Sequence, residues 1–307
     1  MTAAMTPDQG AAWARERLAQ VEHALEAWVP ADAPGGLGEA MRYGVLDGGK
    51  RLRPLLVLAA CESVGGDEQA AMRAAVAVEL IHAYSLIHDD MPCMDNDVLR
   101  RGKPTVHVAY GEACAMLAGD AMQALAFEVL TPEEGEGAGV APALQARLVR
   151  LLARASGESG MAGGQAIDLA SVGQALDEAT LRDMHQRKTG ALLRASVQMG
   201  AACGGIPTES PAWTALTAYG HAMGLAFQIV DDVLDATQGS DKLGKTAGKD
   251  ADANKPTYVS LLGLDGARAE ADGLLQQALD ALARSGLPPE ATGALAAIAE
   301  RIVRRDH

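Results

Sequence analysis

The chain has 307 residues, enough for one large domain or two ordinary ones, and 49% of them are hydrophobic, which supports a substantial buried core. A net charge of −14 argues against nucleic acid as a partner. Only 3% of the residues are aromatic, and the abundance of alanine, leucine and valine favours helices packed through small residues over a β-rich fold.

The first third of the chain is expected to be helical. Thr6, followed by Pro7 and Gln9, is an N-cap signature. Apolar residues then recur at roughly helical spacing, and residues 30–36 contain the prolines and glycines of a loop. Further helices are expected at residues 37–46, 53–64 and 67–90. The last of these ends in an acidic sequence.

Helices also account for most of the remaining chain. They are expected near residues 110–129, 142–157, 160–170, 180–202, 210–236, 257–284 and 288–305. Thr180 and Asp183 are expected to cap one of them. Residues 238–256 are rich in glycine, lysine and aspartate and are interpreted as a mobile loop. Because no strand alternation, repeat or linker is evident, one all-α domain covering residues 1–307 is the simplest interpretation.

The sequence HDDMPCMDNDVLRRGKPT at 88–105 combines acids with two adjacent arginines. Carboxylates about 4 Å apart repel by about 4 kcal/mol at an effective dielectric of ~20, so a cation is expected among them. Hard oxygen ligands suit Mg²⁺, and Arg100 and Arg101 suit phosphate oxygens. Because Pro92 disfavours helix before it, we expect a loop that turns Asp95 toward Asp89. The alternative is a solvated acidic turn followed by a basic one.

A second acidic sequence, FQIVDDVLD, follows a run of residues 210–230 that contains no charged side chain. Asp231 and Asp235 share one helix face, with Gln228 one turn earlier. The run is long enough to span a bilayer, but its polar residues and the acids that follow favour a buried helix of a soluble bundle. Acids attached to an apolar helix indicate a site and not surface decoration.

These sequences resemble those of the trans-isoprenyl diphosphate synthases. The form with a two-residue insertion in the first motif resembles bacterial farnesyl and plant or bacterial geranylgeranyl diphosphate synthases. Further matching segments, in family order from about residue 40 to 262, are GGKRLRP at 48–54, LAGDA at 117–121, GGQAIDL at 163–169, KTG at 188–190 and LGKTAGKD at 243–250. The resemblance implies the isoprenoid synthase fold, a single-domain bundle of about ten or more helices around a central cavity.

The resemblance also implies the site. Asp89, Asp95 and Asp231 would together hold three Mg²⁺ ions. The residues implied to hold the diphosphate of isopentenyl diphosphate are Lys50, Arg53, His82 and Arg101. Those implied to contact the allylic diphosphate are Arg100, Lys188, Thr189, Gln228, Lys245 and Lys255. Charge on Arg100, Lys188, Lys245 and Mg²⁺ would neutralise the allylic diphosphate as its C1–O bond breaks.

Product length is expected to depend on the residues one helical turn, roughly 5–6 Å, before Asp89. Tyr84 and Ser85 lie there. An aromatic residue at this position resembles the farnesyl type, which predicts a C15 product. Asn96 resembles geranylgeranyl enzymes, which keeps a C20 product as the alternative.

Location and competing functions complete the expectations. The four cysteines show no C-x-x-C spacing, which indicates a reducing compartment. Residues 1–10 do not resemble a signal peptide, and a cytoplasmic protein without membrane insertion is predicted. A homodimer is implied by the family alone. A terpene cyclase would need a different second motif, a non-catalytic synthase subunit would lack an acidic motif, and a Mg²⁺-binding structural bundle is the plainest alternative.

Overall fold

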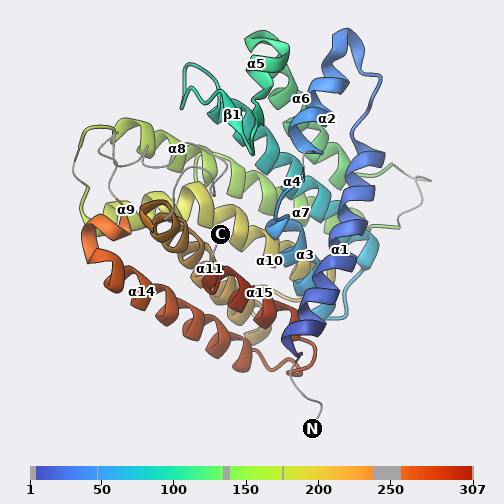
Figure 1. Cartoon of the computed structure of the whole chain (residues 1–307). Helices are drawn as coiled ribbons and strands as arrows, with labels where there is room; N and C mark the ends of the chain where they lie inside the picture. Colours follow the sequence, from blue (N-terminus) through green and yellow to red (C-terminus); the bar gives the residue numbers. More distant parts are fainter. Residues whose placement is uncertain (1–4, 47, 134–138, 175, 238–256, 306–307) are drawn as a thin grey trace.

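The computed structural model describes residues 5–46, 48–133, 139–174, 176–237 and 257–305, and these residues are mostly helical (Figure 1). The elements are α1 (Pro7–Trp28), η1 (Pro34–Gly36), α2 (Leu37–Val45), α3 (Leu52–Ser63), α4 (Glu68–Asp89), β1 (Leu99–Arg100), β2 (Lys103–Pro104), α5 (Val106–Tyr110), α6 (Glu112–Leu130), α7 (Pro142–Ser156), α8 (Met161–Ala170), α9 (Glu178–His185), the π-helical turn η2 (Gln186–Gly190), α10 (Ala191–Cys203), α11 (Pro211–Thr237), α14 (Tyr258–Ala283) and α15 (Gly293–Val303). The predicted all-α class is confirmed.

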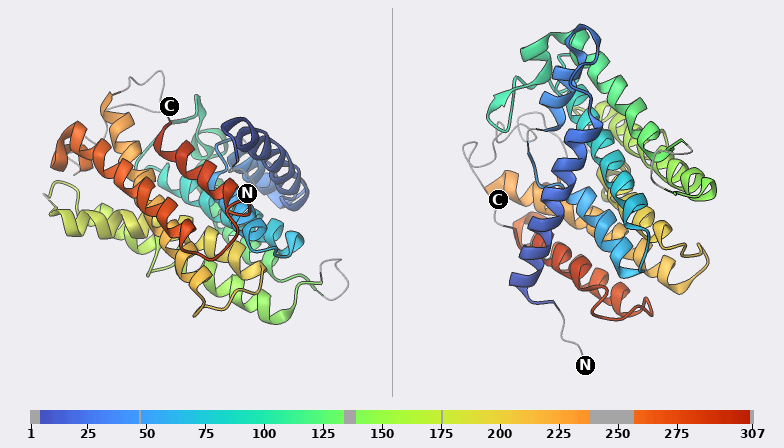
Figure 2. Two further views of the ribbon diagram at one scale, coloured as in Figure 1. Left: turned by 90° about the horizontal axis from the view of Figure 1, so that it is seen from below. Right: turned by 90° about the vertical axis from the view of Figure 1, so that its right-hand side faces the viewer.

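The two helices that carry the acidic sequences are α4 and α11, and α10 lies between them. Helix α10 contacts α3, α4 and α11, while α6 packs on α4 and α14 packs on α11. Helices α1 and α14 flank the bundle on opposite sides (Figure 2). One cluster of buried hydrophobic residues extends from Ala14 in α1 to Ile302 in α15, in keeping with the interpretation of a single domain.

Close helix packing depends on small residues, as the composition predicts. A Cβ added at Gly200 of α10 would lie 2.2 Å from the carbonyl oxygen of Val57 in α3. A Cβ added at Gly224 of α11 would lie 2.6 Å from Cα of Gly190 in η2. A larger residue at either position would force these elements apart, so the glycines set how closely α10 packs on α3 and α11 packs on η2.

Several helix ends differ from the prediction. The capping box of α1 is confirmed, because Thr6 Oγ1 accepts from Gln9 N and Gln9 Oε1 accepts from Thr6 N. The Thr180–Asp183 capping pair is wrong. Helix α9 begins earlier, and Asp177 Oδ1 accepts from Thr180 N at 2.8 Å, because a carboxylate three residues ahead is a better acceptor for that amide.

Two further features concern the connections. The strands β1 and β2 pair antiparallel, a short hairpin that the sequence did not predict. The expected mobile loop at 238–256, with Lys245 and Lys255, lies outside the described residues.

By length and composition α4 and α6 could each cross a membrane. Inside the protein, 72% of the apolar window of α4 and 39% of that of α6 is buried.

Candidate active site

The first acidic motif lies where α4 ends. Beyond Asp89 the chain folds back, and Asp95 N donates to Asp89 O at 2.9 Å while Asp97 N donates to Asp90 O at 3.1 Å. The prediction that the loop brings Asp95 beside Asp89 is therefore confirmed. Burial raises the pKa of the Asp89 carboxyl to about 6; the charge of Lys188 opposes this shift, and that of Asp95 adds to it.

Asp90 has a different role from its neighbour, because it holds Arg100. Arg100 Nε donates to Asp90 Oδ2 at 2.8 Å and Arg100 Nη2 donates to Asp90 Oδ1 at 2.6 Å. Asp90 is 2% exposed, whereas a third of the Arg100 side chain is exposed. The bidentate pair fixes the guanidinium plane in the field of Asp89 and Asp95.

Lys188 faces the same acids from the π-helical turn η2. Its Nζ donates to Asp168 Oδ2 of α8 at 2.6 Å. Burial lowers the pKa of Lys188, but the charges of Asp168 and Asp89 outweigh burial and raise it, so the ammonium group stays protonated. The turn packs tightly on α8, where a Cβ at Gly164 would lie 2.2 Å from Lys188 N.

The segment GGKRLRP is anchored by its middle arginine. Arg51 has a left-handed backbone, with φ 43° and ψ 38°, at the start of α3. Its Nε donates to Glu22 Oε1 of α1 at 2.7 Å, and its Nη1 donates to Glu79 Oε1 of α4 at 2.7 Å. This ion triad, in which Arg51 and Glu79 are buried, ties α1 and α4 to the segment and holds Lys50 and Arg53 on either side of Arg51.

Positive charge gathers beside this segment. Arg101 Nη1 donates to Gly48 O, which places the second arginine of the pair against GGKRLRP. His82 of α4 is half-buried, and desolvation together with the charges of Arg53 and Arg101 keeps its pKa well below its usual value. The imidazole is therefore neutral. Within the described residues, the buried Nε of Arg53 has no hydrogen-bond partner, which leaves a donor for an anion.

The first two aspartates of the second acidic motif make different contacts. Asp232 is buried and accepts from Gln228 Nε2 at 3.1 Å and from Tyr258 N at 2.8 Å, so it fixes the start of α14. Gln228 Oε1 in turn accepts from Thr189 Oγ1 at 3.2 Å. Asp231 lies on the more open face of α11, and its side chain is 37% exposed.

Each acidic motif lies within electrostatic reach of basic side chains. Burial lowers the pKa of both Lys50 and Arg53, and at each of them the charge of Asp231 acts in the opposite direction. On the other side, Lys188 lies within the field of Asp89 and next to Thr189, which bonds to the α11 helix. Helix α10 contacts both motif helices.

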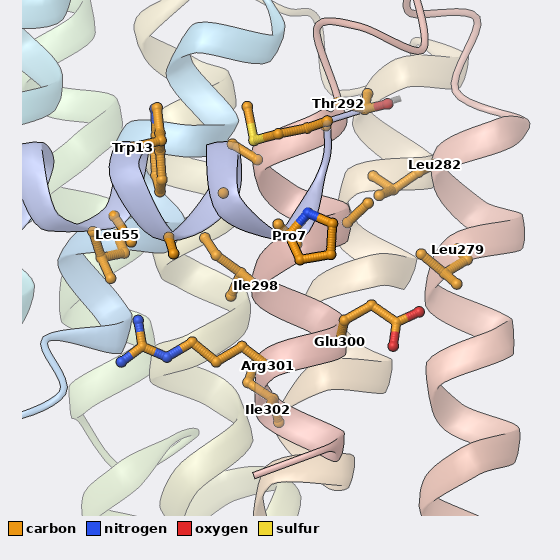
Figure 3. Close-up of a pocket in the computed structure, with 18 of the residues that line it drawn as sticks. Pro7, Trp13, Leu55, Leu279, Leu282, Thr292, Ile298, Glu300, Arg301 and Ile302 are labelled. Carbon is orange, nitrogen blue, oxygen red and sulfur yellow. The ribbon is translucent and has the colours of Figure 1, made fainter. Parts of the chain in front are cut away.

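A cavity of about 1050 Å³ opens beside this site. Figure 3 shows Trp13 of α1, Leu55 of α3 and Ile298 and Ile302 of α15 on its walls. Lys50 and Arg305 also line it, whereas Tyr84 and Asp89 do not. The cavity therefore adjoins the GGKRLRP side of the site and not the side of the predicted product-length residues.

The product-length residues lie on α4, one turn before the first motif. The Tyr84 hydroxyl accepts from Gln123 Nε2 of α6 at 3.4 Å, and the Tyr84 ring meets His88 edge to face at 5.7 Å. Ser85 Oγ donates to the carbonyl of His82 at 2.8 Å, within its own helix. Of the two, Tyr84 is the side chain that bridges α4 and α6.

The donor set suits magnesium shared with a substrate. Among the described residues, no group of three or more histidine, cysteine, aspartate or glutamate side chains is placed to hold an ion by itself. Mg²⁺ commonly takes one or two carboxylates and completes its shell with water and substrate phosphate oxygens. Asp89 and Asp95 offer such a pair, and burial, with the charge of Asp95 adding to it, raises the pKa of Asp89 to about 6.

Several residues of the site were missed by sequence reasoning. They are Glu22, Glu79, Asp90, Asp168, Asp232 and Arg305. Asp90, Asp168 and Asp232 stand inside segments that resemble family motifs, so a search for partners of the assigned cations could have proposed them. The other three have no local signal, because their partners are far away in the sequence.

The comparisons with known proteins agree with this geometry. The polyprenyl synthetase family profile matches residues 35–286. Geranylgeranyl pyrophosphate synthase 9, chloroplastic, of Arabidopsis thaliana is 50% identical over 288 residues, covering 93% of this chain and 78% of the relative. The heterodimeric geranylgeranyl pyrophosphate synthase large subunit 1, chloroplastic, of the same plant is 46% identical over 94% of this chain and 77% of its own. These relatives contradict the predicted cytoplasmic location, because they are chloroplastic proteins.

Solved structures share both fold and sequence with the chain. An FPP/GFPP synthase from Zymomonas mobilis has 43% identity and a TM-score of 0.84, covering 97% of this chain and 100% of its own. A geranyltransferase from Helicobacter pylori, complexed with magnesium and isoprenyl diphosphate, has 34% identity and a TM-score of 0.81, covering 94% of this chain and 96% of its own. The chain thus has the fold that the resemblance implied, and it belongs to the polyprenyl synthetase family of prenyltransferases.

Proposed function

We propose that this prenyltransferase joins isopentenyl diphosphate to an allylic diphosphate in a Mg²⁺-dependent reaction. The observation that supports the proposal best is that each acidic helix segment has basic side chains in its field. Asp89 acts on Lys188 and Arg100, and Asp231 acts on Lys50 and Arg53. Two diphosphates and their counter-ions need such a balance of charges.

We propose that Asp89, Asp95 and Asp231 together hold three Mg²⁺ ions, the number that the family resemblance implies. Their carboxylate oxygens are the donors that Mg²⁺ prefers. When bound, the ions would supply positive charge that stabilises the diphosphate leaving group.

The proposed allylic diphosphate subsite lies beside the first motif. Arg100 is oriented by Asp90, and Lys188 is kept protonated by Asp168 and Asp89. Their charges would stabilise the oxygen that leaves C1 of the allylic group. Thr189 and Gln228 are proposed as further contacts in this subsite. Lys245 and Lys255 remain predicted contacts that lie outside the described residues.

The proposed isopentenyl diphosphate subsite consists of Lys50, Arg53, His82 and Arg101. A neutral His82 can donate one hydrogen bond to a phosphate oxygen without adding to the crowded positive charge. Holding this substrate by its diphosphate would aim its double bond at C1 of the allylic cation. The C1–O bond breaks first, the double bond then forms the new C–C bond to C1, and a proton passes to the released diphosphate.

We propose a C20 product, geranylgeranyl diphosphate, in place of the C15 product predicted from the sequence. The named relatives from Arabidopsis thaliana and Capsicum annuum support this, at 46–50% identity. Farnesyl diphosphate stays the second candidate, because the Tyr84 side chain bridges α4 and α6 one turn before the first motif.

A homodimer is proposed from the apolar face of α6. Val108, Met116 and Leu117 are exposed on α5 and α6, and less than half of the apolar window of α6 is buried within the chain. A second copy would cover such a face. The large subunit among the relatives is named as part of a heterodimer, so size measurement of the purified chain is needed to separate the two assemblies.

The test is product analysis of the purified chain. Dimethylallyl, geranyl and farnesyl diphosphate are each supplied with labelled isopentenyl diphosphate, with Mg²⁺ or with EDTA, and the products are sized by chromatography. A linear C20 diphosphate formed only with Mg²⁺ supports the proposal, and a product that stops at C15 favours the second candidate. A cyclic hydrocarbon would point to a terpene cyclase, and no condensation at all would contradict the proposed reaction.

A further inference from the structure

The second acidic motif already has a cation within the chain. Arg305, two residues beyond the end of α15, places Nη2 at 2.5 Å from Asp231 Oδ1. The same Nη2 donates to the carbonyl of Phe227 at 2.9 Å, and the guanidinium lies over the Phe227 ring at 4.2 Å from its centroid. The Arg305 side chain is only 8% exposed. Three contacts therefore fix this arginine on α11.

This contact conflicts with the metal ligand proposed at Asp231. A guanidinium hydrogen-bonded to a carboxylate oxygen neutralises the charge that attracts a divalent cation, and it repels a cation that approaches the same carboxylate. The region is already positive, since Lys50 lies within the field of both Arg305 and Arg301. Arg305 and a divalent ion therefore compete for the Asp231 carboxylate.

We propose, on the basis of the proposed function, that Arg305 is an internal counter-ion of the second acidic motif and that divalent metal must displace it from Asp231. The cavity lined by Arg305 offers space for the displaced side chain. When the second motif binds metal, Arg305, just beyond the end of α15, thus loses its contact with Asp231. Binding of metal at Asp231 is weaker than the carboxylates alone would allow, because the arginine competes.

The neighbouring arginine provides a matched control. Arg304 has the same charge and lies one residue earlier, but its Nη1 pairs with Asp272 of α14 at 2.8 Å and its side chain is 62% exposed. Arg304→Met and Arg305→Met remove the same charge from adjacent positions, and only the second removes it from Asp231.

The experiment measures binding of Mn²⁺ alone to the whole chain by electron paramagnetic resonance. Arg305→Met is expected to bind Mn²⁺ about tenfold more tightly than wild type at the second motif, the scale of one charged hydrogen bond. Arg304→Met is expected to keep the wild-type affinity. Equal affinities for the two variants would overturn the proposal.

Two further measurements separate this proposal from the function on which it rests. Asp231→Asn should weaken Mn²⁺ binding; if it does so while Arg305→Met has no effect, only the counter-ion proposal fails. If Asp231→Asn binds Mn²⁺ as wild type does, the metal site itself is wrong. In the wild-type chain, Mn²⁺ with inorganic pyrophosphate should speed amide hydrogen exchange at Arg304 and Arg305, and unchanged exchange would contradict displacement.

Discussion

Replacing Asp89 by asparagine should stabilise the metal-free protein at neutral pH. Burial holds the pKa of Asp89 near 6, compared with its usual 3.8. An unfolded carboxyl thus loses its proton more readily than the folded one, and ionised Asp89 opposes folding. The difference corresponds to at most about 3 kcal/mol of unfolding free energy. Asparagine keeps the shape of the side chain and removes the charge.

The stability gained by Asp89→Asn should depend on pH. Below about pH 4 both the folded and the unfolded carboxyl bind a proton, so Asp89→Asn should change stability little. The gain should grow as the pH rises from 4 to 6 and then stay constant. Urea unfolding in EDTA at pH 4 and pH 7.5 measures it, with the fully exposed Asp265→Asn as a control. A loss of stability at pH 7.5 would refute the reasoning.

Three other changes have expected outcomes. Arg51→Met should lower the unfolding free energy by about 3–5 kcal/mol, measured in urea, because it leaves Glu79 buried without its cation. Gly164→Ala should lower kcat in the condensation assay, because the added Cβ would meet Lys188 N at 2.2 Å and shift that turn. Tyr84→Ala should lengthen the product, measured by chromatography, because it removes the aromatic side chain that bridges α4 and α6.

Each of these changes has a control or a contrary result. Arg17→Met removes a more exposed pair with Glu62 and should cost far less than Arg51→Met; equal losses would contradict the role of the buried triad. Gly273→Ala adds a Cβ in open space and should leave kcat unchanged. Products of unchanged length from Tyr84→Ala would show that this tyrosine does not limit the chain.

Local signals were enough to predict the helices and one acidic loop. The capping box at Thr6 and the apolar spacing that follows it depend on neighbouring residues, and α1 has the predicted start. Pro92 predicted the turn that brings Asp95 back to Asp89. The cap at Asp177 was missed because two acceptors compete for the same helix start, and only the fold decides between them.

Long-range pairing limited the prediction of the site. Arg51 pairs with Glu22 and Glu79, which are 29 and 28 positions away, and Asp231 pairs with Arg305, 74 positions away. A list of charged residues does not say which of them meet, because the packing of the helices sets those distances. The product length shows the same limit, since Tyr84 favoured C15 whereas the named relatives favour C20.

The most direct test of shared metal binding is anomalous scattering from a crystal of the chain with Mn²⁺ and an allylic thiodiphosphate. We expect Mn²⁺ peaks at Asp89 and Asp95 and at Asp231, all in contact with the oxygens of one diphosphate. Peaks at only one motif, or at two motifs with no diphosphate between them, would contradict the claim that the two acidic helices act on one substrate.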